Sequence, residues 1–498
     1  MDPHYCYSVP TQEILVPVYE TLLRYDKDDP EGLIPCLAES YEISENGYSY
    51  IFHLRDDVTF HDGTPFTAED VLYSYERLLS LYFGPAWLLD PIDLEASYAI
   101  DPYTLNITLH HPYAPFIYTV ASQWGDLIVN SKVVKAHATA EDPWAHEWLK
   151  ENMEGTGSGP YMLEEWVPED HITLVKNPNY WGGWDKPHVD KIYMPLISES
   201  ATQRLRLEEG TLDVGLLTLE DAMAVEGMEG INVEIVPGLT NYFIYMNTQK
   251  PPLDNKLIRH ALSYMYDYEG MIEAVRHGLG TQARGPIPKS LWGWNPDAKQ
   301  FTYNLTKAEE LIRQAGYEPE DIKLDYWYME APEPRRIAEI LQAGAAEIGV
   351  EITLHGTTWA ILVETAHPGS HDTNDGADLS ALYWWPDYAD PQSHIEPLLA
   401  SFVDEPTTNT SDYSYYNWAF YCNPEVNRLL DEAVTETDVS KRVEIYHQMQ
   451  EIICEDAPAI WIFDSLNTLS YRDWVKGYYF NPLYTGCTDF YSIYIEGR

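Results

Sequence analysis

Positively charged residues are scarce in this chain of 498 residues. Only 30 side chains are Lys or Arg, whereas 80 are Asp or Glu, so the formal net charge is -50. A nucleic-acid-binding surface needs clustered Lys and Arg side chains that contact phosphates, and a strongly negative field repels polyanions and anionic lipid surfaces. The composition therefore excludes nucleic acid as a partner.

Long apolar runs are also missing. No stretch approaches the roughly 20 apolar residues that a membrane-spanning helix needs. The first residues, MDPH, contain neither the basic region nor the apolar region of a signal peptide. Hydrophobic residues nevertheless make up 45% of the chain and aromatic residues 13%. This apolar content excludes a disordered protein and, with the length, predicts several folded domains.

Cysteine is rare, and the five residues are widely scattered with no spacing typical of a zinc site. Cys36 and Cys454 lie in apolar segments and are predicted to be buried. Among Cys6, Cys422 and Cys487 a single disulfide is possible, and the odd total leaves at least one thiol unpaired.

The hydrophobic pattern changes repeatedly between the periods of strands and helices, which predicts a mixed α/β protein. Strands are predicted over residues 48–54, 104–109, 161–166, 171–175, 192–195, 233–236 and 241–246. Helices are predicted over residues 12–24, 67–77, 200–208, 258–266, 269–275 and 307–314. The succession of a strand at 323–328, a helix at 335–348 and a strand at 350–354 predicts a βαβ unit with a partly parallel sheet.

Four sequence blocks follow one another along the chain, and the ordered set is more specific than any single block. They contain FHDGTPFTAEDV at residues 60–71, NPNYW at 177–181, YMNT with PLDNKLIRHAL at 245–262, and WPDYADP with NPEV at 385–426. In this order the blocks resemble the peptide/nickel class of bacterial extracellular solute-binding proteins. These are the receptors that feed ABC importers for oligopeptides, dipeptides, nickel chelates and some oligosaccharides.

The resemblance implies an α/β fold of two lobes, with mixed sheets and an extra domain inserted in lobe I. Lobe I would comprise residues 1–33, the extra domain 34–180, and residues 181–246 and 471–498, whereas lobe II would comprise residues 247–470. The two lobes would close over a ligand by a hinge motion.

The resemblance also implies a function without catalysis. We expect a monomeric receptor that captures an extracellular peptide, in our interpretation an oligopeptide, in the cleft between the lobes and delivers it to ABC permease subunits. No cofactor and no metal are expected. The protein would lie in the periplasm or, as a lipoprotein, on the outer face of the cell membrane, and its export or anchor segment would be absent from this chain.

One carboxylate stands out as the expected ligand contact. In peptide-binding relatives, a carboxylate in the motif matched by WWPDYADP accepts the α-ammonium of the peptide, and the matching residue is Asp387. An ammonium has three donors, and a desolvated carboxylate offers it short, charge-assisted hydrogen bonds. The alternative is a turn residue, with the neighbouring Asp390 capping the helix that follows Pro391.

Tyr7 and Val9 lie in the segment YSVP, which resembles the part of lobe I whose backbone pairs with an extended peptide. The alternative for this segment is an ordinary loop before the first helix.

Four aromatic residues are predicted to face the ligand: Trp384, Trp385, Tyr242 and Tyr245. Their rings can cover a peptide side chain or a sugar face while a polar tip stays wet. Packing in the core is the alternative for each of them, and alternate residues of a strand face opposite sides.

Other ligands stay open because the positions matched around residues 328–332 and 379–382 contain no Lys or Arg to clamp a peptide C-terminus. A neutral oligosaccharide is the main alternative. A nickel or metal-chelate receptor would have to use histidines such as His367 and His371, which lie in a polar loop. A glycosidase needs two carboxylates at a fixed separation, and no motif places such a pair.

Overall fold

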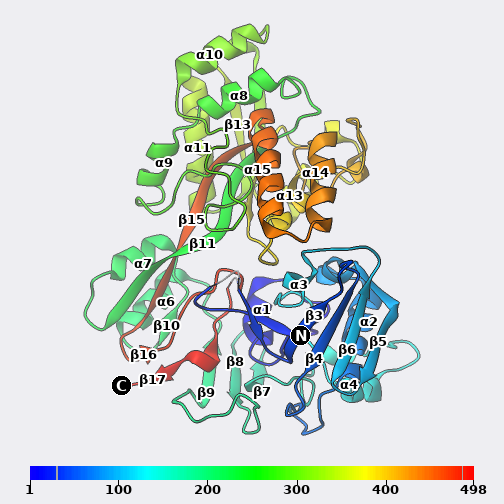
Figure 1. Ribbon diagram of the computed structural model, residues 1–498. Helices are drawn as coiled ribbons and strands as arrows, with labels where there is room; N and C mark the ends of the chain where they lie inside the picture. The colour runs from blue at the N-terminus through cyan, green and yellow to red at the C-terminus, as the bar shows by residue number, and fades with distance from the viewer. Residues whose placement is uncertain (30–31, 485) are drawn as a thin grey trace. The chain divides into compact units, whose positions relative to one another are not determined.

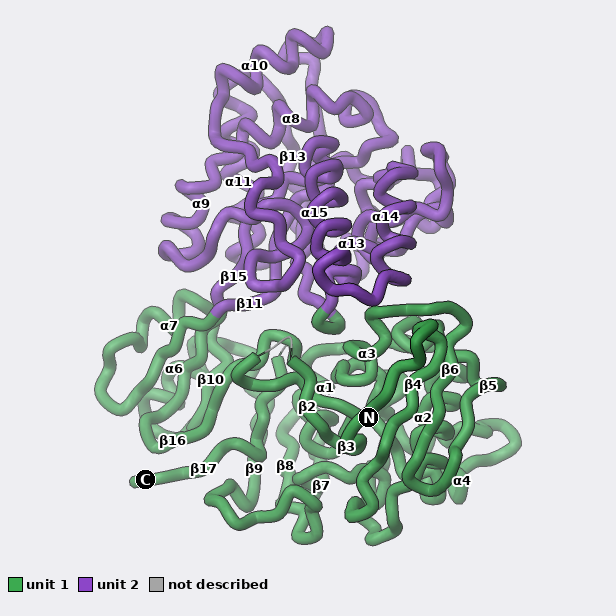
Figure 2. The backbone as a smooth tube through the Cα atoms, viewed as in Figure 1, with its two compact units in different colours: residues 1–236, 387–389, 467–498 green, residues 237–386, 390–466 purple. Residues whose placement is uncertain are grey.

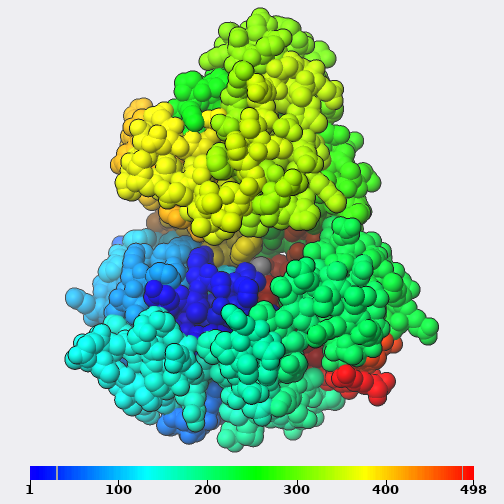
Figure 3. All heavy atoms as spheres, turned by 180° about the vertical axis from the view of Figure 1, so that it is seen from behind, coloured from blue at the N-terminus to red at the C-terminus, as the bar shows by residue number. Residues whose placement is uncertain are grey.

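The computed structural model describes residues 1–29, 32–484 and 486–498 (Figure 1). The chain divides into two compact units (Figure 2). Unit 1 comprises Met1–Val236, Asp387–Ala389 and Asn467–Arg498, and unit 2 comprises Pro237–Pro386 and Asp390–Leu466. Figure 3 shows the N-terminal segment, in dark blue, at the surface of unit 1 on the face turned away in Figure 1.

The first sheet of unit 1 has four antiparallel strands in the order β3-β4-β6-β5. Its strands are β3 (Ala38–Ile43), β4 (Ser49–Leu54), β5 (Ile92–Asp101) and β6 (Thr104–Leu109). In β4 the side chains of Tyr50, Phe52 and Leu54 are buried and their neighbours are not, which is the alternation of a strand with one face on the core. The strands predicted at 48–54 and 104–109 are confirmed.

The second sheet of unit 1 is the antiparallel series β7 (Tyr161–Val167), β8 (His171–Lys176) and β9 (Lys191–Pro195). The hairpin predicted from residues 161–175 is therefore confirmed. A core of apolar side chains that includes Tyr161 and Leu174 underlies it.

The sequence prediction of the first helix is wrong. The expected helix at 12–24 is the short α1 (Val9–Leu15), and Leu23–Tyr25 forms strand β1, which pairs with β2 (Leu33–Pro35). Proline accounts for the difference: Pro10 suits the first turn of a helix, whereas Pro17 lacks the N–H donor that a helix interior needs.

The helix predicted at 67–77 is α2 (Ala68–Leu81), and its N-terminus explains why it starts there. Thr67 and Asp70 form a capping box, in which the Thr67 N–H donates to Asp70 Oδ2 at 2.9 Å. The other oxygen of the Asp70 carboxylate accepts from the hydroxyl of Ser131 at 2.6 Å, so one buried acid joins two helix starts.

The remaining elements of unit 1 are short. The helical segments are η1 (Gly84–Leu89), α3 (Phe116–Thr119), α4 (Ser131–His137), α5 (His146–Leu149), α6 (Ser200–Glu208), α7 (Leu219–Val225) and η5 (Phe490–Ser492). The strands are β10 (Val214–Gly215), β16 (Val475–Lys476) and β17 (Tyr494–Ile495). The helix predicted at 200–208 is confirmed by α6.

The main sheet of unit 2 contains β15 (Ala459–Arg472), β11 (Ile231–Met246), β14 (Leu379–Trp384), β12 (Lys323–Met329) and β13 (Glu351–Thr357) in that order, and β10 pairs with the far end of β15. Strand β12 runs parallel to β13 and to β14, whereas β11 and β14 are antiparallel. Helix α11 (Pro332–Glu347) connects β12 and β13, so the predicted βαβ unit is confirmed.

The other helical segments of unit 2 surround this sheet (Figure 1). They are α8 (Lys256–Tyr264), α9 (Tyr268–Ala274), α10 (Leu305–Gln314), η2 (Pro319–Asp321), α12 (Trp359–Ala366), η3 (Thr373–Asp375), α13 (Gln392–Leu399), η4 (Thr410–Asp412), α14 (Pro424–Thr435) and α15 (Val439–Asp456). A large apolar core lies between the sheet and helices α8 to α11.

The chain passes between the units inside two long strands and again on either side of residues 387–389. The divisions within strands fall at 236/237 in β11 and at 466/467 in β15, and the lobe bounds expected near residues 246 and 470 stay a prediction. The two strands predicted at 233–236 and 241–246 are one continuous strand. The extra domain predicted over 34–180 stays a prediction.

The possible disulfide among Cys6, Cys422 and Cys487 is not formed. All five cysteines lie in the described residues and none is part of a disulfide. The thiol of Cys422 donates to the Val403 carbonyl at 3.3 Å, and that of Cys487 donates to Gln123 Oε1 at 2.8 Å. Within the described ranges, every helix is too short or too polar to cross a membrane.

Candidate ligand-binding site

The carboxyl group of Asp387 is buried in unit 1, with 2% of the residue exposed. The Tyr7 hydroxyl donates to Asp387 Oδ1 at 2.7 Å, and the Ser122 hydroxyl donates to the Asp387 carbonyl at 2.7 Å. The Tyr7 ring in turn packs edge-on against Trp124, with the centroids 4.9 Å apart. The aromatic neighbours exclude water and fix the orientation of the carboxyl group.

The two following residues are held by unit 1 as well. The hydroxyls of Tyr113 and Tyr388 are 3.3 Å apart, and the Ala389 N–H donates to the Tyr25 hydroxyl at 3.2 Å. The ring of Trp87 lies against that of Tyr388, with the centroids 6.2 Å apart. Residues 387–389, called here the 387–389 segment, are therefore bound by side chains from several separate parts of unit 1.

Burial raises the pKa of Asp387 to about 7, and the hydrogen bond from Tyr7 opposes this shift only in part. The cause is desolvation, which disfavours the charged form of a carboxyl group. A cation placed beside this carboxyl would restore the charged form and gain a strong interaction, because a desolvated ion pair is weakly screened. An ammonium group is such a cation.

Asp390 has a different environment in unit 2. Its carboxylate forms a buried ion pair with Arg442, with Oδ2 and Nη1 2.7 Å apart, and Oδ1 accepts from the Tyr446 hydroxyl at 2.8 Å. The Gln392 N–H also donates to Oδ1 at 3.0 Å, at the start of α13. Asp390 precedes the N-cap of α13, which is Pro391 and has no side-chain cap, so its carboxylate acts through the ion pair and these local hydrogen bonds.

An apolar pocket of about 230 Å³ lies in unit 2. It opens where β12 and β14 end and where α11 and α12 begin, and in open α/β sheets this carboxyl edge of parallel strands is the common place for ligands. Its walls include Tyr242, Met329, Trp359, Leu362, Ala381 and Trp385. Every side chain that lines it is apolar or aromatic.

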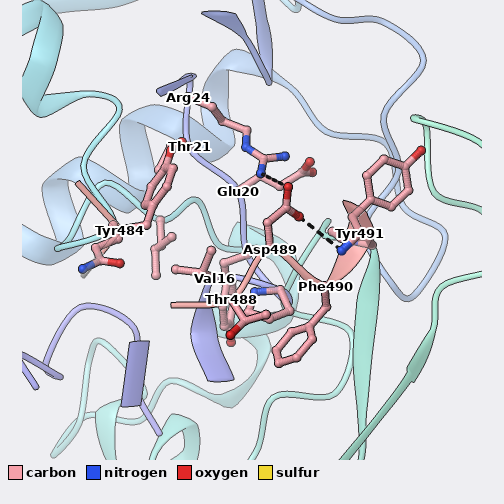
Figure 4. A pocket seen from close by; sticks show the side chains of 14 residues that line it. Val16, Glu20, Thr21, Arg24, Tyr484, Thr488, Asp489, Phe490 and Tyr491 are labelled. Carbon is pink, nitrogen blue, oxygen red and sulfur yellow. Dashed lines mark hydrogen bonds and ion pairs between the residues drawn. The ribbon is translucent and has the colours of Figure 1, made fainter. Parts of the chain in front are cut away.

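A smaller pocket lies in unit 1 (Figure 4). Glu20, Arg24 and Asp489 line it, and Arg24 Nη2 is 3.7 Å from Asp489 Oδ2. Its volume of about 30 Å³ is that of a single water molecule, so it is too small for a peptide or a sugar.

The sequence and structure comparisons identify the family. Residues 32–405 match the family described as "Bacterial extracellular solute-binding proteins, family 5 Middle". The chain belongs to this family. Among its relatives is the "Probable D,D-dipeptide-binding periplasmic protein DdpA" of Escherichia coli (strain K12), 34% identical over 474 residues that cover 94% of this chain and 87% of the relative.

Two further relatives show how widely the ligands of the family differ. "Heme-binding protein A" of Haemophilus influenzae is 30% identical over 507 residues, covering 97% of this chain and 87% of the relative. The structure of DppA from Helicobacter pylori "in complex with peptide STSA" is 26% identical, with a TM-score of 0.81, and covers 100% of this chain and 96% of that one.

Members of family 5 are substrate-binding receptors of peptide/nickel-class ABC importers and have the two-lobe fold of periplasmic binding proteins. The family and the α/β two-lobe fold class predicted from the four sequence blocks are therefore confirmed.

The structure separates the four aromatic residues predicted to face a family 5 ligand. Tyr242 and Trp385 line the apolar pocket. Tyr245 and Trp384 are buried elsewhere: the Tyr245 hydroxyl donates to the Leu398 carbonyl at 3.1 Å, and the Trp384 indole N–H donates to the Ser393 carbonyl at 2.8 Å. Successive side chains along strands β11 and β14 point to opposite faces of the sheet, which explains why only one residue of each pair lines the pocket.

Tyr7 contributes a side chain that the sequence did not predict. The expectation concerned the backbone of residues 7–10, whereas the structure uses the Tyr7 hydroxyl on Asp387. Val9 is the first residue of α1, where a backbone N–H has no partner inside the helix. The sequence also did not predict the contacts that three further residues make with the 387–389 segment, because no sequence motif connects them to it. These residues are Ser122, Tyr25 and Tyr113.

The residues considered for a peptide clamp and for a metal site contact other side chains of the protein. Arg335 Nε donates to Glu330 Oε1 at 2.9 Å on the surface. His367 lies near the Tyr415 ring, and the His371 ring is 3.4 Å from the Thr410 hydroxyl. In the part of the chain that the structure describes, no three His, Cys, Asp or Glu side chains are grouped to hold a metal ion.

Proposed function

We propose that this protein is the receptor of an ABC importer that captures a peptide outside the cytoplasm and delivers it to the permease subunits. The observation that carries the proposal is the buried carboxyl group of Asp387, which is held by Tyr7 within the motif WWPDYADP. The comparisons support a peptide, since relatives named for dipeptides cover nearly the whole chain.

The chemistry of Asp387 suits the α-ammonium of a peptide. The carboxyl group is desolvated, so an ammonium that binds it replaces lost water contacts with charge-assisted hydrogen bonds. Tyr7 donates to Oδ1 and fixes the plane of the carboxylate. Removing one partner of such a buried charge pair typically costs about 3 to 5 kcal/mol.

The ligand in this proposal is an oligopeptide longer than two residues. A dipeptide receptor must hold the C-terminal carboxylate close to the ammonium site, and a guanidinium is the group best matched to it. Arg335, which lies nearest in sequence to the matched positions, is exposed and paired with Glu330. A longer peptide can leave its C-terminus in solvent. Closure of the two lobes over this ligand stays a prediction.

Native mass spectrometry of freshly purified protein tests the class of ligand directly. We expect a set of co-purified peptides of several lengths. A neutral oligosaccharide in their place would contradict the peptide assignment and favour the alternative ligand of this family.

Calorimetry then tests Asp387 itself. We expect Asp387→Asn to weaken a peptide with an unmodified N-terminus by about 100-fold to 1,000-fold. An N-acetylated peptide should bind the original protein equally weakly and lose little more in the variant, because its ammonium is gone. Asp404→Asn, on the surface of unit 2, is the matched control. Equal losses for acetylated and unmodified peptides in Asp387→Asn would show that Asp387 has only a structural role.

A further inference from the structure

The chain segment that precedes Tyr7 is bound to unit 1 by a buried ion pair. The Asp2 carboxylate and the Arg77 guanidinium of helix α2 are both buried, with 1% and 0% of each residue exposed. Arg77 donates from Nη1 to Asp2 Oδ1 at 2.8 Å and from Nη2 to Oδ2, so the contact is bidentate. The His146 ring of α5 adds a third contact, with Nδ1 2.9 Å from Oδ2. A bidentate pair of this kind fixes the direction of the carboxylate as well as its position.

The ion pair is charged at neutral pH. Burial alone would raise the pKa of Asp2, but the hydrogen bonds and the charge of Arg77 outweigh burial and hold this pKa below its ordinary value. The titratable groups that face Asp2 are Arg77 of α2, His146 of α5 and His4 of the same segment. Burial lowers the pKa of His4 to about 4, so the His4 ring is neutral. Detaching residue 2 would therefore leave a buried guanidinium without its counter-charge.

Residues 2–7, called here the N-terminal strap, contact unit 1 at two further points. The His4 Nε2 atom is 2.8 Å from the Leu127 carbonyl oxygen in a buried position. The Tyr5 ring stacks on the Phe83 ring, with the centroids 3.8 Å apart. These contacts and the ion pair come from separate parts of unit 1, so they fix the path of the strap and not only its first residue.

A glycine allows the strap to lie close to η1. Gly84 has a φ of +56°, in the left-handed region that side chains other than glycine rarely adopt. A Cβ atom added to Gly84 would lie 3.1 Å from the Tyr7 Cβ atom and 3.4 Å from the Tyr5 carbonyl oxygen. The strap therefore contacts this backbone directly, at the residue that reaches Asp387.

Tyr7, the last residue of the strap, connects it to the 387–389 segment. The Tyr7 hydroxyl donates to Asp387 Oδ1 at 2.7 Å, and its ring lies edge-on to Trp124. Residues 387–389 belong to unit 1, so the ion pair, the strap and the carboxyl group lie in one compact unit. A displacement of the strap by about 1 Å would carry the hydroxyl beyond the range of a hydrogen bond.

We propose that Arg77 is a positioning residue for Asp387, because through Asp2 and the N-terminal strap it holds the Tyr7 hydroxyl against the carboxyl group that meets the ligand. The part of this inference that concerns the ligand rests on the proposed function. The part that connects Arg77, Tyr7 and Asp387 holds without any ligand. The alternative is that helix α1, which follows the strap, holds Tyr7 by itself.

Carbon-13 NMR of ligand-free protein labelled at the aspartate carboxyl groups tests the connection. The Asp387 signal, assigned with Asp387→Asn, reports its pKa. Tyr7→Phe should raise this pKa, because the Tyr7 hydrogen bond opposes the effect of burial, and Arg77→Met should raise it by the same amount. The double variant should show no further rise, since both changes remove one hydrogen bond. Additive shifts, or an unchanged pKa in Arg77→Met, would overturn the proposal.

A second variant leaves the buried ion pair intact and avoids any loss of folding. Tyr5→Ala removes the stack on Phe83, whose ring is half exposed, and should raise the pKa of Asp387 by less than Arg77→Met does. Amide hydrogen exchange of the strap should become about fivefold faster in Tyr5→Ala and about 100-fold faster in Arg77→Met. Faster exchange in both variants with an unchanged Asp387 signal would show that α1 alone holds Tyr7, and would overturn the proposal.

Two matched controls separate this effect from a general loss of stability. Arg259→Met removes a buried guanidinium of unit 2 that donates to backbone carbonyls such as that of Leu253. Tyr98→Ala removes an exposed ring from strand β5 of unit 1. Exchange of the strap and the pKa of Asp387 should be the same in both controls as in the original protein. A shift of the Asp387 signal in Arg259→Met equal to that in Arg77→Met would overturn the proposal.

Calorimetry separates this inference from the proposed function. At pH 7, Arg77→Met should weaken a peptide with an unmodified N-terminus about fivefold, as Tyr7→Phe does, and should leave an N-acetylated peptide unaffected. A shared shift of the Asp387 signal in protein that binds no peptide would refute the peptide function and keep the role of Arg77. Peptide binding that depends on Asp387 but is unchanged in Arg77→Met would refute the role of Arg77 and keep the function.

Discussion

Asp387 and Asp390 stand three residues apart in one motif, and the structure gives them opposite environments. Both carboxyl groups are buried. Asp390 faces the guanidinium of Arg442 within unit 2, whereas Asp387 accepts a hydrogen bond from the neutral hydroxyl of Tyr7 within unit 1. The partner therefore distinguishes a carboxylate held by a buried guanidinium from one that accepts from a tyrosine hydroxyl and whose pKa is raised by burial.

Loss of the cation beside Asp390 should have the largest effect. We expect Arg442→Met to lower the free energy of unfolding by about 3 to 5 kcal/mol, because it leaves a buried carboxylate without its counter-charge. Urea unfolding measures the change. Arg428→Met, which removes two exposed ion pairs on α14, should change stability by no more than about 1 kcal/mol. A loss as small as that of the Arg428 variant would show that the buried pair adds nothing.

The contribution of Asp387 to the free energy of unfolding should decrease as the pH rises. Its pKa is about 7 in the folded protein, above the ordinary value of 3.8, so the folded state binds the proton more tightly than the unfolded state. The free energy of unfolding should therefore fall between about pH 4 and pH 7, by about 2 to 4 kcal/mol from this group.

Asp387→Asn isolates that contribution because other buried acids are common to both proteins. Urea unfolding at pH 5 and pH 8 should show that the variant loses less stability on going to pH 8 than the original protein does. An identical loss in the two proteins would mean that Asp387 has an ordinary pKa.

Ligand affinity should depend on the same proton. Under the proposed function the ammonium binds the charged carboxylate, so affinity for a peptide should rise about 10-fold from pH 5 to pH 6, a range in which the peptide's own ammonium stays charged. Calorimetry at pH 7 in buffers of different ionisation enthalpy should also detect proton release on binding. The profile of Asp387→Asn should be flat, and a sloping profile in that variant would assign the pH dependence to another group.

The smallest effect is expected from Tyr7→Phe, which removes the hydrogen bond to Asp387 Oδ1 but keeps the ring against Trp124. The pKa of Asp387 should rise further, because this hydrogen bond opposes the effect of burial. Peptide affinity at pH 7 should fall about fivefold, and the pH profile should move to higher pH.

Tyr48→Phe, at an exposed tyrosine of unit 1, is the control for Tyr7→Phe. A fivefold loss with no movement of the pH profile would mean that Tyr7 contacts the ligand without acting on Asp387.

Much of the fold followed from local patterns. Thr67 and Asp70 have the residue types and spacing of a capping box, and helix α2 begins there. The βαβ unit of β12, α11 and β13 was predicted because its three segments have distinct periods and stand next to one another in the chain. The first helix was predicted wrongly because the apolar spacing at 12–24 continued past Pro17, which ends the helix.

The candidate site was predictable only in part. The motif around Asp387 identified the carboxylate, and alternation along β11 warned that Tyr242 and Tyr245 would face opposite sides. That Tyr242 lines the pocket and Tyr245 is buried in the core depended on which helices cover each face of the sheet. Side chains such as Ser122 and Tyr25 belong to no recognisable pattern, because their partners lie in the 387–389 segment, far along the chain.

The sequence alone determined the family, the α/β class and the elements whose signals are local, because caps, turns and hydrophobic periods act between residues a few positions apart. Only the tertiary structure decided that Tyr7 reaches Asp387 across 380 positions, and that Arg442 neutralises Asp390 instead. Both aspartates have the same local chemistry in the sequence. The two carboxyl groups behave differently because burial removes water from both of them. The stability of each negative charge then depends on the partner that the fold supplies.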